Sequence, residues 1–369
     1  MTDSPSPTGT PAWTIRARDG RALIFSCQEF IDEISLGASC FVCGARPGTK
    51  VFNDEHVIPR WVLKRCDLFQ KTITLMDGQV RTYGQYKLPC CQDCNTLLGR
   101  EVETPVSELL AGGFEAIVER LDISKIQLLF LWLCLLFLKT HLKDRSVPQH
   151  PDPRRSQGWL ADAYDWGDLH HLHCVARAPY TRAALEPGVL GSIKIFQIAD
   201  ETTHDTFDYG DFTLAQTISL RLGDFAIVAV LNDSGAAQMA WQEIWPKITG
   251  PISTVQLREA AALLGCANAD LLNRPVFGTA YSPSTDTVRL YAEHDDVPEF
   301  APFDPAKYGE MFAYALRGHM EHLAINGERD PPKVEALIRA GSARFLLDGS
   351  GDFRPAQVVW ALAEPDVRR

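Results

Sequence analysis

The sequence predicts an α+β protein whose first third is a small cysteine-rich unit, and three observations support this fold class. Two CxxC pairs flank a hairpin-like segment early in the 369-residue chain. An apolar run of helical length follows, and strand-like and helix-like patterns alternate beyond residue 148. We therefore expect a disordered tail at 1–20, a cysteine-rich domain at 21–115, a core helix region at 116–147 and an α+β domain at 148–369.

Within the cysteine-rich domain, the segment KTITLMDGQVRTYGQYKLP predicts a β-hairpin with a tight turn at Asp77-Gly78. A helix is expected to begin near Cys94 and to bend near Pro105. The next helix is expected at 124–143 and contains the apolar run 126–138, which has Lys125 and Lys139 at its ends. A membrane span needs about 20 apolar residues, so this run predicts a buried core helix and no membrane association.

The C-terminal region combines both kinds of secondary structure. Strands are expected at 169–178, 191–199 and 215–231, the last turning at Gly223-Asp224, and helices at 255–272, 305–325, 332–347 and 355–362. His170, His171 and His173 with Cys174 are either a second metal site or ordinary strand residues, since on a strand His171 and His173 would share a face. No catalytic motif is recognisable in this region.

The charge distribution separates the two parts of the chain. The formal net charge is −11, but residues 1–120 contain 13 Lys and Arg against 15 Asp and Glu, so the acidity lies mainly beyond them. A chain coated for non-specific nucleic-acid binding would be basic, so a nucleic-acid contact is expected only in the first third. The acidic remainder is expected to bind a protein partner or to form oligomers.

Clustered cysteines predict a structural zinc site. The N-terminal segment MTDSPSPTGTPAW lacks the features of a signal peptide, so we expect a cytoplasmic location, where thiols stay reduced and bind metals. Zinc requires four ligands, and a two-residue spacer directs both sulfurs of a pair at one ion. The predicted ligands are Cys40, Cys43, Cys91 and Cys94. Cys90 is the alternative to Cys91, and we expect it to be a neighbouring thiol.

Three ordered elements carry a family resemblance: CFVC at 40–43, NDEHVIPRW at 53–61 and CQDCN at 91–95. Over residues 36–105 they resemble the HNH, or ββα-metal, endonuclease superfamily, and most closely its recombination-endonuclease-like branch. The resemblance implies a DNA endonuclease in which His56 is the general base and Glu55 and Asn95 bind a catalytic Mg²⁺ or Mn²⁺. In this interpretation the zinc is a separate structural ion.

The chain departs from the family pattern at two places. Gln85 lies nearest the position of the residue that usually orients the general base, and no histidine follows CQDCN within the next turns. Glu103 lies eight residues after Asn95, a little over two helical turns, and is therefore a third candidate for the catalytic metal or a solvated carboxylate.

Substrate contacts and the competing function also follow from this segment. Arg60, Lys64 and Arg65 are expected on one short helix, where they are candidates for phosphate contacts.

RNA stays an alternative to DNA as the substrate, and the resemblance suggests a role in phage defence, restriction or a mobile element. The alternative function is a catalytically inactive, zinc-stabilised module that binds nucleic acid or protein, in which the Glu55–His56 pair is a surface feature.

Overall fold

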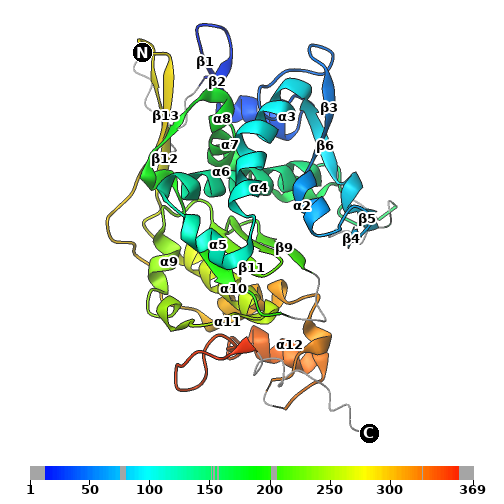
Figure 1. Ribbon diagram of the computed structural model, residues 1–369, viewed down its shortest axis with the longest axis vertical. Coiled ribbons are helices and arrows are strands. Elements are labelled where there is room, and N and C mark those ends of the chain that lie inside the picture. Colours follow the sequence, from blue (N-terminus) through cyan, green and yellow to red (C-terminus); the bar gives the residue numbers. More distant parts are fainter. Residues whose placement is uncertain are drawn as a thin grey trace. The chain divides into compact units, whose positions relative to one another are not determined.

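The computed structural model describes residues 13–74, 80–150, 152, 154, 155, 158–200, 206–325 and 327–356, and its mixture of helices and several small sheets confirms the α+β class (Figure 1). The chain folds into two compact units. Unit 1 comprises Met1–Ala111, Ala116–Val189 and Val276–Glu293; unit 2 comprises Gly112–Glu115, Leu190–Pro275 and His294–Arg369. Unit 1 therefore continues well beyond residue 147, where the sequence analysis expects a new domain.

Unit 1 contains the cysteine-rich segment, the long apolar helix and several small sheets. Its strands are β1 (Ile15–Arg16), β2 (Ala22–Ile24), β3 (Phe52–His56), β4 (Thr72–Thr74), β5 (Val80–Thr82), β6 (Lys87–Cys91), β7 (Ala184–Leu185), β12 (Val276–Ser282) and β13 (Thr287–Glu293). Its helices are α1 (Cys27–Glu29), α2 (Arg60–Arg65), α3 (Gln92–Leu98), α4 (Thr104–Leu109), most of α5 (Gly113–Arg120), α6 (Ile123–Asp144), α7 (His170–Ala176) and α8 (Ala178–Thr181).

The order strand, strand, helix is built by β3, β6 and α3. β3 and β6 pair antiparallel, so Glu55 lies opposite Leu88 and His56 lies opposite Lys87. β4 and β5 pair as the predicted hairpin requires, although the Asp77-Gly78 turn lies outside the described residues. A π-helical segment separates α3 from α4 just before Pro105, where a wider turn accommodates the ring and its missing N–H.

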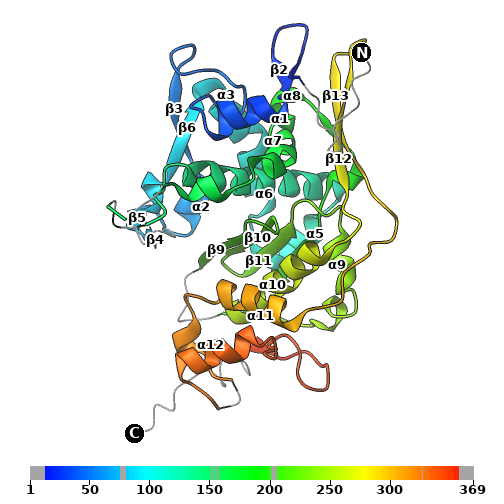
Figure 2. The same cartoon turned by 180° about the vertical axis from the view of Figure 1, so that it is seen from behind.

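The long helix α6 is the core of unit 1. Asp122 caps its start by accepting a hydrogen bond from the Lys125 backbone N–H at 2.9 Å. Every side chain from Leu129 to Lys139 is buried, and α7 packs along the helix (Figure 2). Among the described residues, only α6 has the length and apolar composition of a membrane span, and 61% of its most apolar window is buried inside the structure.

Two sequence-based assignments in unit 1 are wrong. The predicted strand 169–178 is the helix α7, because Leu172, Val175 and Ala176 form a helical face that is buried. The predicted disordered tail 1–20 is ordered at its C-terminal end, because β1 pairs with β2 and the Ser26 backbone N–H donates to the Thr14 hydroxyl at 3.0 Å.

Unit 2 consists of a four-stranded antiparallel sheet followed by helices. The strands run in the order β8 (Ile193–Gln197), β11 (Phe225–Val230), β10 (Thr217–Leu222) and β9 (Phe207–Phe212). The buried helix α10 (Thr254–Asp270) packs on β10 and β11, and α11 (Pro305–Ala315) and α12 (Pro331–Arg339) follow it as further layers (Figure 1). The remaining helix of this unit is α9 (Ala236–Ala240).

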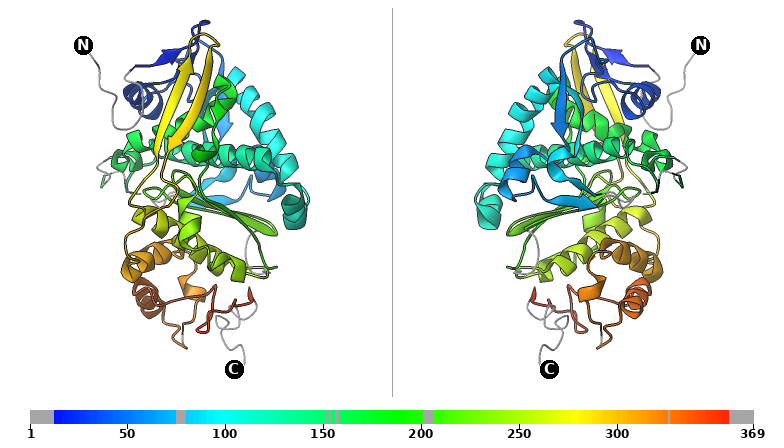
Figure 3. Two further views of the ribbon diagram at one scale, coloured as in Figure 1. Left: turned by 90° about the vertical axis from the view of Figure 1, so that its left-hand side faces the viewer. Right: turned by 90° about the vertical axis from the view of Figure 1, so that its right-hand side faces the viewer.

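Most predictions for this region are confirmed in kind but differ in length. The strand at 191–199, the two strands of 215–231 and the helix at 255–272 are present. The helices expected at 305–325 and 332–347 end earlier, at Ala315 and Arg339, and most of the helix expected at 355–362 lies outside the described residues. The hairpin β12–β13, which the sequence analysis did not anticipate, belongs to unit 1 and pairs with β7 there (Figure 3).

Candidate functional site

Four cysteines of unit 1 form a cluster that fits a metal ion such as zinc. The Sγ atoms of Cys40, Cys43, Cys91 and Cys94 all lie within 4.8 Å of one another. The Cys43 and Cys91 sulfurs are 3.6 Å apart, close to the roughly 3.8 Å edge of a tetrahedron with metal–sulfur bonds of 2.3 Å. Among the described residues this is the only such group of His, Cys, Asp and Glu side chains. The predicted set of zinc ligands is therefore confirmed as a cluster.

Cys90 lies beside this cluster and is not part of it. Its Sγ is 3.8 Å from that of Cys40 and is buried, in agreement with the prediction that Cys91 is the ligand and Cys90 a neighbouring thiol. The Cys91 backbone N–H also points at the Cys40 sulfur, at 3.4 Å. Such an N–H stabilises a metal-bound thiolate by partly neutralising its charge.

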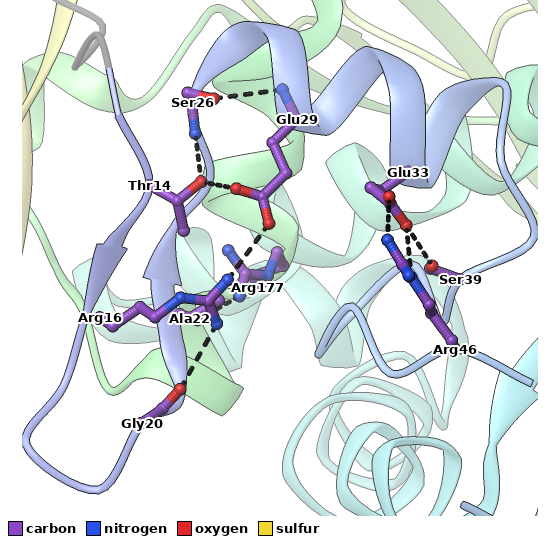
Figure 4. Close-up of polar contacts among 10 residues, drawn as sticks. All are labelled: Thr14, Arg16, Gly20, Ala22, Ser26, Glu29, Glu33, Ser39, Arg46 and Arg177. Atoms are coloured by element: carbon purple, nitrogen blue, oxygen red, sulfur yellow. Dashed lines mark hydrogen bonds and ion pairs between the residues drawn. The ribbon is translucent and has the colours of Figure 1, made fainter. Parts of the chain in front are cut away.

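The loop that carries Cys40 and Cys43 depends on a glycine. The Gly44 N–H donates to the Cys40 carbonyl at 2.8 Å, and Gly44 has a φ of +73°, which side-chain-bearing residues rarely adopt. A Cβ at this position would also lie 2.5 Å from the Phe25 ring. The outer side of the loop is held by Arg46, whose guanidinium pairs with Glu33 at 2.6 Å (Figure 4).

Helix α7 supports the cysteine loop from the interior. The His173 Nε2 is 2.7 Å from the Phe41 carbonyl oxygen. The Arg177 guanidinium donates to the carbonyls of Leu23 and Val42 and to that of Ala22, the last contact being drawn in Figure 4. Burial lowers the pKa of Arg177 to about 10, so this residue is still charged at neutral pH. These contacts join the CxxC loop to the β1–β2 hairpin through one buried cation.

The alternative second metal site at His171, His173 and Cys174 is not formed. All three lie on a helix, and the His171 ring stacks on Phe277 with centroids 3.6 Å apart. His170, on the same helix, has its Nε2 2.8 Å from the Phe25 carbonyl oxygen. The histidines of this segment are therefore packing residues with backbone partners or aromatic neighbours.

Glu55 and Glu103 meet at a buried lysine. The Lys139 Nζ lies 2.7 Å from Glu55 Oε1, 3.3 Å from Glu103 Oε1 and 2.9 Å from the backbone oxygen of His56. The Lys139 side chain is 1% exposed and that of Glu55 is 8% exposed. Burial by itself lowers the pKa of Lys139, but the two carboxylates outweigh it and leave that pKa above its ordinary value. Burial raises the pKa of Glu103.

Asn95, the third candidate ligand of a catalytic metal, has another partner. It lies in the first turns of α3, directly after Cys94, and its Nδ2 donates to Asn53 Oδ1 at 2.9 Å. Asn53 and Glu55 are two residues apart on β3 and so lie on the same face of the strand. Of the three candidate ligands, Glu55 and Glu103 therefore each direct one oxygen at Lys139, while the Asn95 amide nitrogen is bound to Asn53.

His56 lies on the other face of β3 and is half-buried. Burial and then the charge of Lys87, its neighbour across the strands, lower the pKa of His56, so its imidazole is mostly neutral near pH 7. The edge of Phe69 approaches the ring with centroids 6.4 Å apart. Within the described part of the chain no hydrogen bond to the ring is formed, and Gln85 is exposed in a separate short helical turn.

The three predicted phosphate contacts, Arg60, Lys64 and Arg65, lie on α2 as expected, and all three are exposed. Arg65 also donates from Nη1 to the Leu110 carbonyl at 2.7 Å, so it fastens α2 to the end of α4. The charges of Lys87 and Arg60 both contribute to the lowered pKa of His56, and the Lys87 Nζ is 3.8 Å from Asp54 Oδ2.

Sequence reasoning missed Lys139, Arg177 and Lys87. Lys139 ends an apolar run, which is typical of a lysine that reaches solvent, yet α6 stays buried on both sides of it. The sequence signal that could have found it is Leu142, an apolar residue less than one turn further along the helix, which is also buried.

Searches against protein-family models, curated proteins and solved structures find no match to this chain.

Proposed function

We propose that unit 1 is an HNH-type phosphodiesterase that hydrolyses nucleic acid, with DNA as the first expected substrate and His56 as the general base. One observation carries the proposal: an antiparallel strand pair is followed by a helix, and a four-cysteine cluster joins them, with His56 at the end of the first strand. This order of elements matches the resemblance of residues 36–105. The zinc in this proposal is structural.

The chemistry assigned to His56 is proton transfer. The neutral imidazole accepts a proton from a water molecule, whose oxygen forms a bond to phosphorus while the bond from phosphorus to the leaving sugar oxygen breaks, and the leaving oxygen takes a proton from solvent. The transition state is more negative at the phosphoryl oxygens, and in this proposal Arg60 and Lys87, whose charges act on His56, balance that charge. Lys139 fixes the backbone of His56 through its carbonyl and so limits the movement of the strand end. A catalytic Mg²⁺ or Mn²⁺ stays a prediction from the resemblance.

Replacing His56 by alanine is expected to lower plasmid cleavage at least 100-fold, because general-base catalysis contributes roughly 10²–10⁴ to such rates. Purified zinc-loaded protein is incubated with supercoiled plasmid or single-stranded RNA, with Mg²⁺, with Mn²⁺ and after chelation of free divalent ions. His294→Ala, an exposed histidine of unit 2, is the matched control and is expected to retain wild-type activity. Equal cleavage by folded His56→Ala and wild type contradicts the assignment.

The cleavage rate is expected to rise with pH and to level off below pH 7. A general base acts in its neutral form, and burial and Lys87 hold the pKa of His56 below its ordinary value of about 6.5. Activity is therefore lost only as the pH falls through this lowered pKa. kcat/KM is measured between pH 5 and 8, with zinc content checked at each pH because thiolate ligands protonate in acid. A midpoint above 7 rules out this assignment for His56.

A second function is favoured by the burial of Glu55 against Lys139. Because this carboxylate is buried on Lys139, unit 1 also suits a zinc-stabilised module that binds nucleic acid or protein without cutting it. The plasmid experiment separates the two functions: a band shift without cleavage at any metal concentration supports the binding module. Under either function, the role of unit 2 in binding a protein partner or forming oligomers is a proposal from its acidic composition.

A further inference from the structure

The most unusual group in unit 1 is the ammonium of Lys139, which is enclosed in the interior and has a complete set of partners. A lysine ammonium has three N–H donors. The three acceptors around Lys139 are one oxygen of Glu55, one of Glu103 and the carbonyl of His56, at 2.7, 3.3 and 2.9 Å. No donor of this group is therefore left for a substrate, and its 1% exposure keeps water and phosphate away from it.

These acceptors are hard oxygens of the kind that Mg²⁺ and Mn²⁺ prefer. Glu55 is also the carboxylate that the resemblance assigns to a catalytic metal, and Glu103 is the further candidate that its spacing from Asn95 suggests. They come from β3 and from the π-helical segment after α3, while the cation comes from α6, so three separate elements converge here. The site is built as a cation site, and the cation that it contains belongs to the chain.

We propose that the Lys139 ammonium is the resident cation of this site and excludes Mg²⁺ or Mn²⁺ from Glu55 and Glu103. The inference deepens the proposed function and rests on it, because it concerns the carboxylates of the same HNH-like site. A divalent ion beside Lys139 would face a positive charge within a few ångströms in a poorly solvated interior, where repulsion is strong. It would also need oxygens at 2.0–2.1 Å for Mg²⁺, while the ammonium holds them further apart.

Lys139 is accordingly a positioning residue. It holds the Glu55 side chain and the His56 backbone at the same time, so the end of β3 is fixed by a group that has no contact with substrate. Asn95 is not among the acceptors of the ammonium, and its Nδ2 donates to Asn53. The HNH-like centre then acts through His56 and the cations around it, with no divalent metal on Glu55.

The test is Mn²⁺ binding by zinc-loaded protein, followed by the electron paramagnetic resonance signal of free Mn²⁺. The proteins compared are wild type, Glu55→Gln and Glu101→Gln, an exposed glutamate of the same π-helical segment as Glu103. Wild type and both variants are expected to bind Mn²⁺ with affinities within about twofold. A tenfold or larger loss in Glu55→Gln, with no change in Glu101→Gln, overturns the proposal because it shows a metal on Glu55.

Removing the resident cation gives the complementary result. Lys139→Met leaves two carboxylates and a carbonyl facing one another, and it is expected to gain a Mn²⁺ site at least tenfold stronger than any in wild type. The gain is expected to vanish in the double variant Glu55→Gln, Lys139→Met. A folded, zinc-loaded Lys139→Met protein without the gain overturns the proposal. If Lys139→Met does not fold, the comparison of wild type with Glu55→Gln decides alone.

These measurements do not depend on activity, so they separate the two proposals. Mn²⁺ results as expected, together with plasmid cleavage that persists in His56→Ala, leave the resident cation supported and the nuclease assignment contradicted. If cleavage requires His56 and Mn²⁺ binds through Glu55, the nuclease assignment is supported and the resident-cation proposal is contradicted.

Discussion

Replacing Cys91 by serine is expected to release the metal and to abolish cooperative unfolding of unit 1. Structural zinc sites contribute on the order of 10–16 kcal/mol of apparent binding free energy, which matches or exceeds the roughly 5–15 kcal/mol stability of a folded domain. Cys91 closes the cluster from the end of β6, at the start of α3, so its loss also separates the strand pair from the helix. Zinc content by elemental analysis and thermal unfolding by circular dichroism measure both effects.

The adjacent thiol supplies the matched control. Cys90→Ser is expected to retain one zinc per chain, because Cys90 lies 3.8 Å from Cys40 but outside the group of four sulfurs. The substitution is expected to lower the free energy of unfolding by about 1–3 kcal/mol, because a polar hydroxyl replaces a buried thiol. A Cys90→Ser protein that loses zinc while Cys91→Ser retains it would show that the ligand assignment is reversed.

The second large effect is expected from Arg177→Met, which should lower the free energy of unfolding by at least about 3 kcal/mol. The substitution keeps most of the side-chain volume but leaves the buried carbonyls of Ala22, Leu23 and Val42 without their donor, and each unsatisfied buried group costs about 1–3 kcal/mol. The guanidinium also lies over the Phe25 ring at 4.4 Å, and that cation–π contact is lost as well.

Urea denaturation of the zinc-loaded protein measures this loss. The control is Arg182→Met, an exposed arginine one turn further along the chain, which is expected to change the stability by less than about 0.5 kcal/mol. Equal stabilities for Arg177→Met and Arg182→Met would mean that water replaces the guanidinium at all three carbonyls. In that case the β1–β2 hairpin does not depend on α7.

The features that the sequence predicts well are those determined locally. The CxxC spacing alone directs two sulfurs at one point, so Cys40, Cys43, Cys91 and Cys94 are found without knowledge of the fold. The apolar run of α6 is too long to be exposed to water and too short to span a membrane, so it predicts a buried helix. Gly223-Asp224 marks the turn between β10 and β11, where Gly223 has a φ of +73°.

The features that it predicts poorly depend on distant partners. The segment HHLHCVA is compatible with both strand and helix periodicity, and only packing against α6 selects the helix. Lys139 finds its partner Glu55 across 84 residues of sequence, so no local pattern distinguishes it from a lysine in solvent. For the same reason, the sequence suggests a metal for Glu55 and offers Glu103 as a further candidate ligand or a solvated carboxylate, since the competing ammonium lies on another element.

The discontinuous path of unit 1 has a consequence for how the protein is made. All four clustered cysteines leave the ribosome with the first segment, whereas the hairpin β12–β13, which pairs with β7, is synthesised only after all four strands of unit 2's sheet and after α10. At a synthesis rate of 5–20 residues per second, roughly 10–40 s pass between synthesis of the last clustered cysteine and synthesis of the last strand of unit 1. Metal capture during that interval would protect the thiols from oxidation and organise the N-terminal segment before its remaining partners exist.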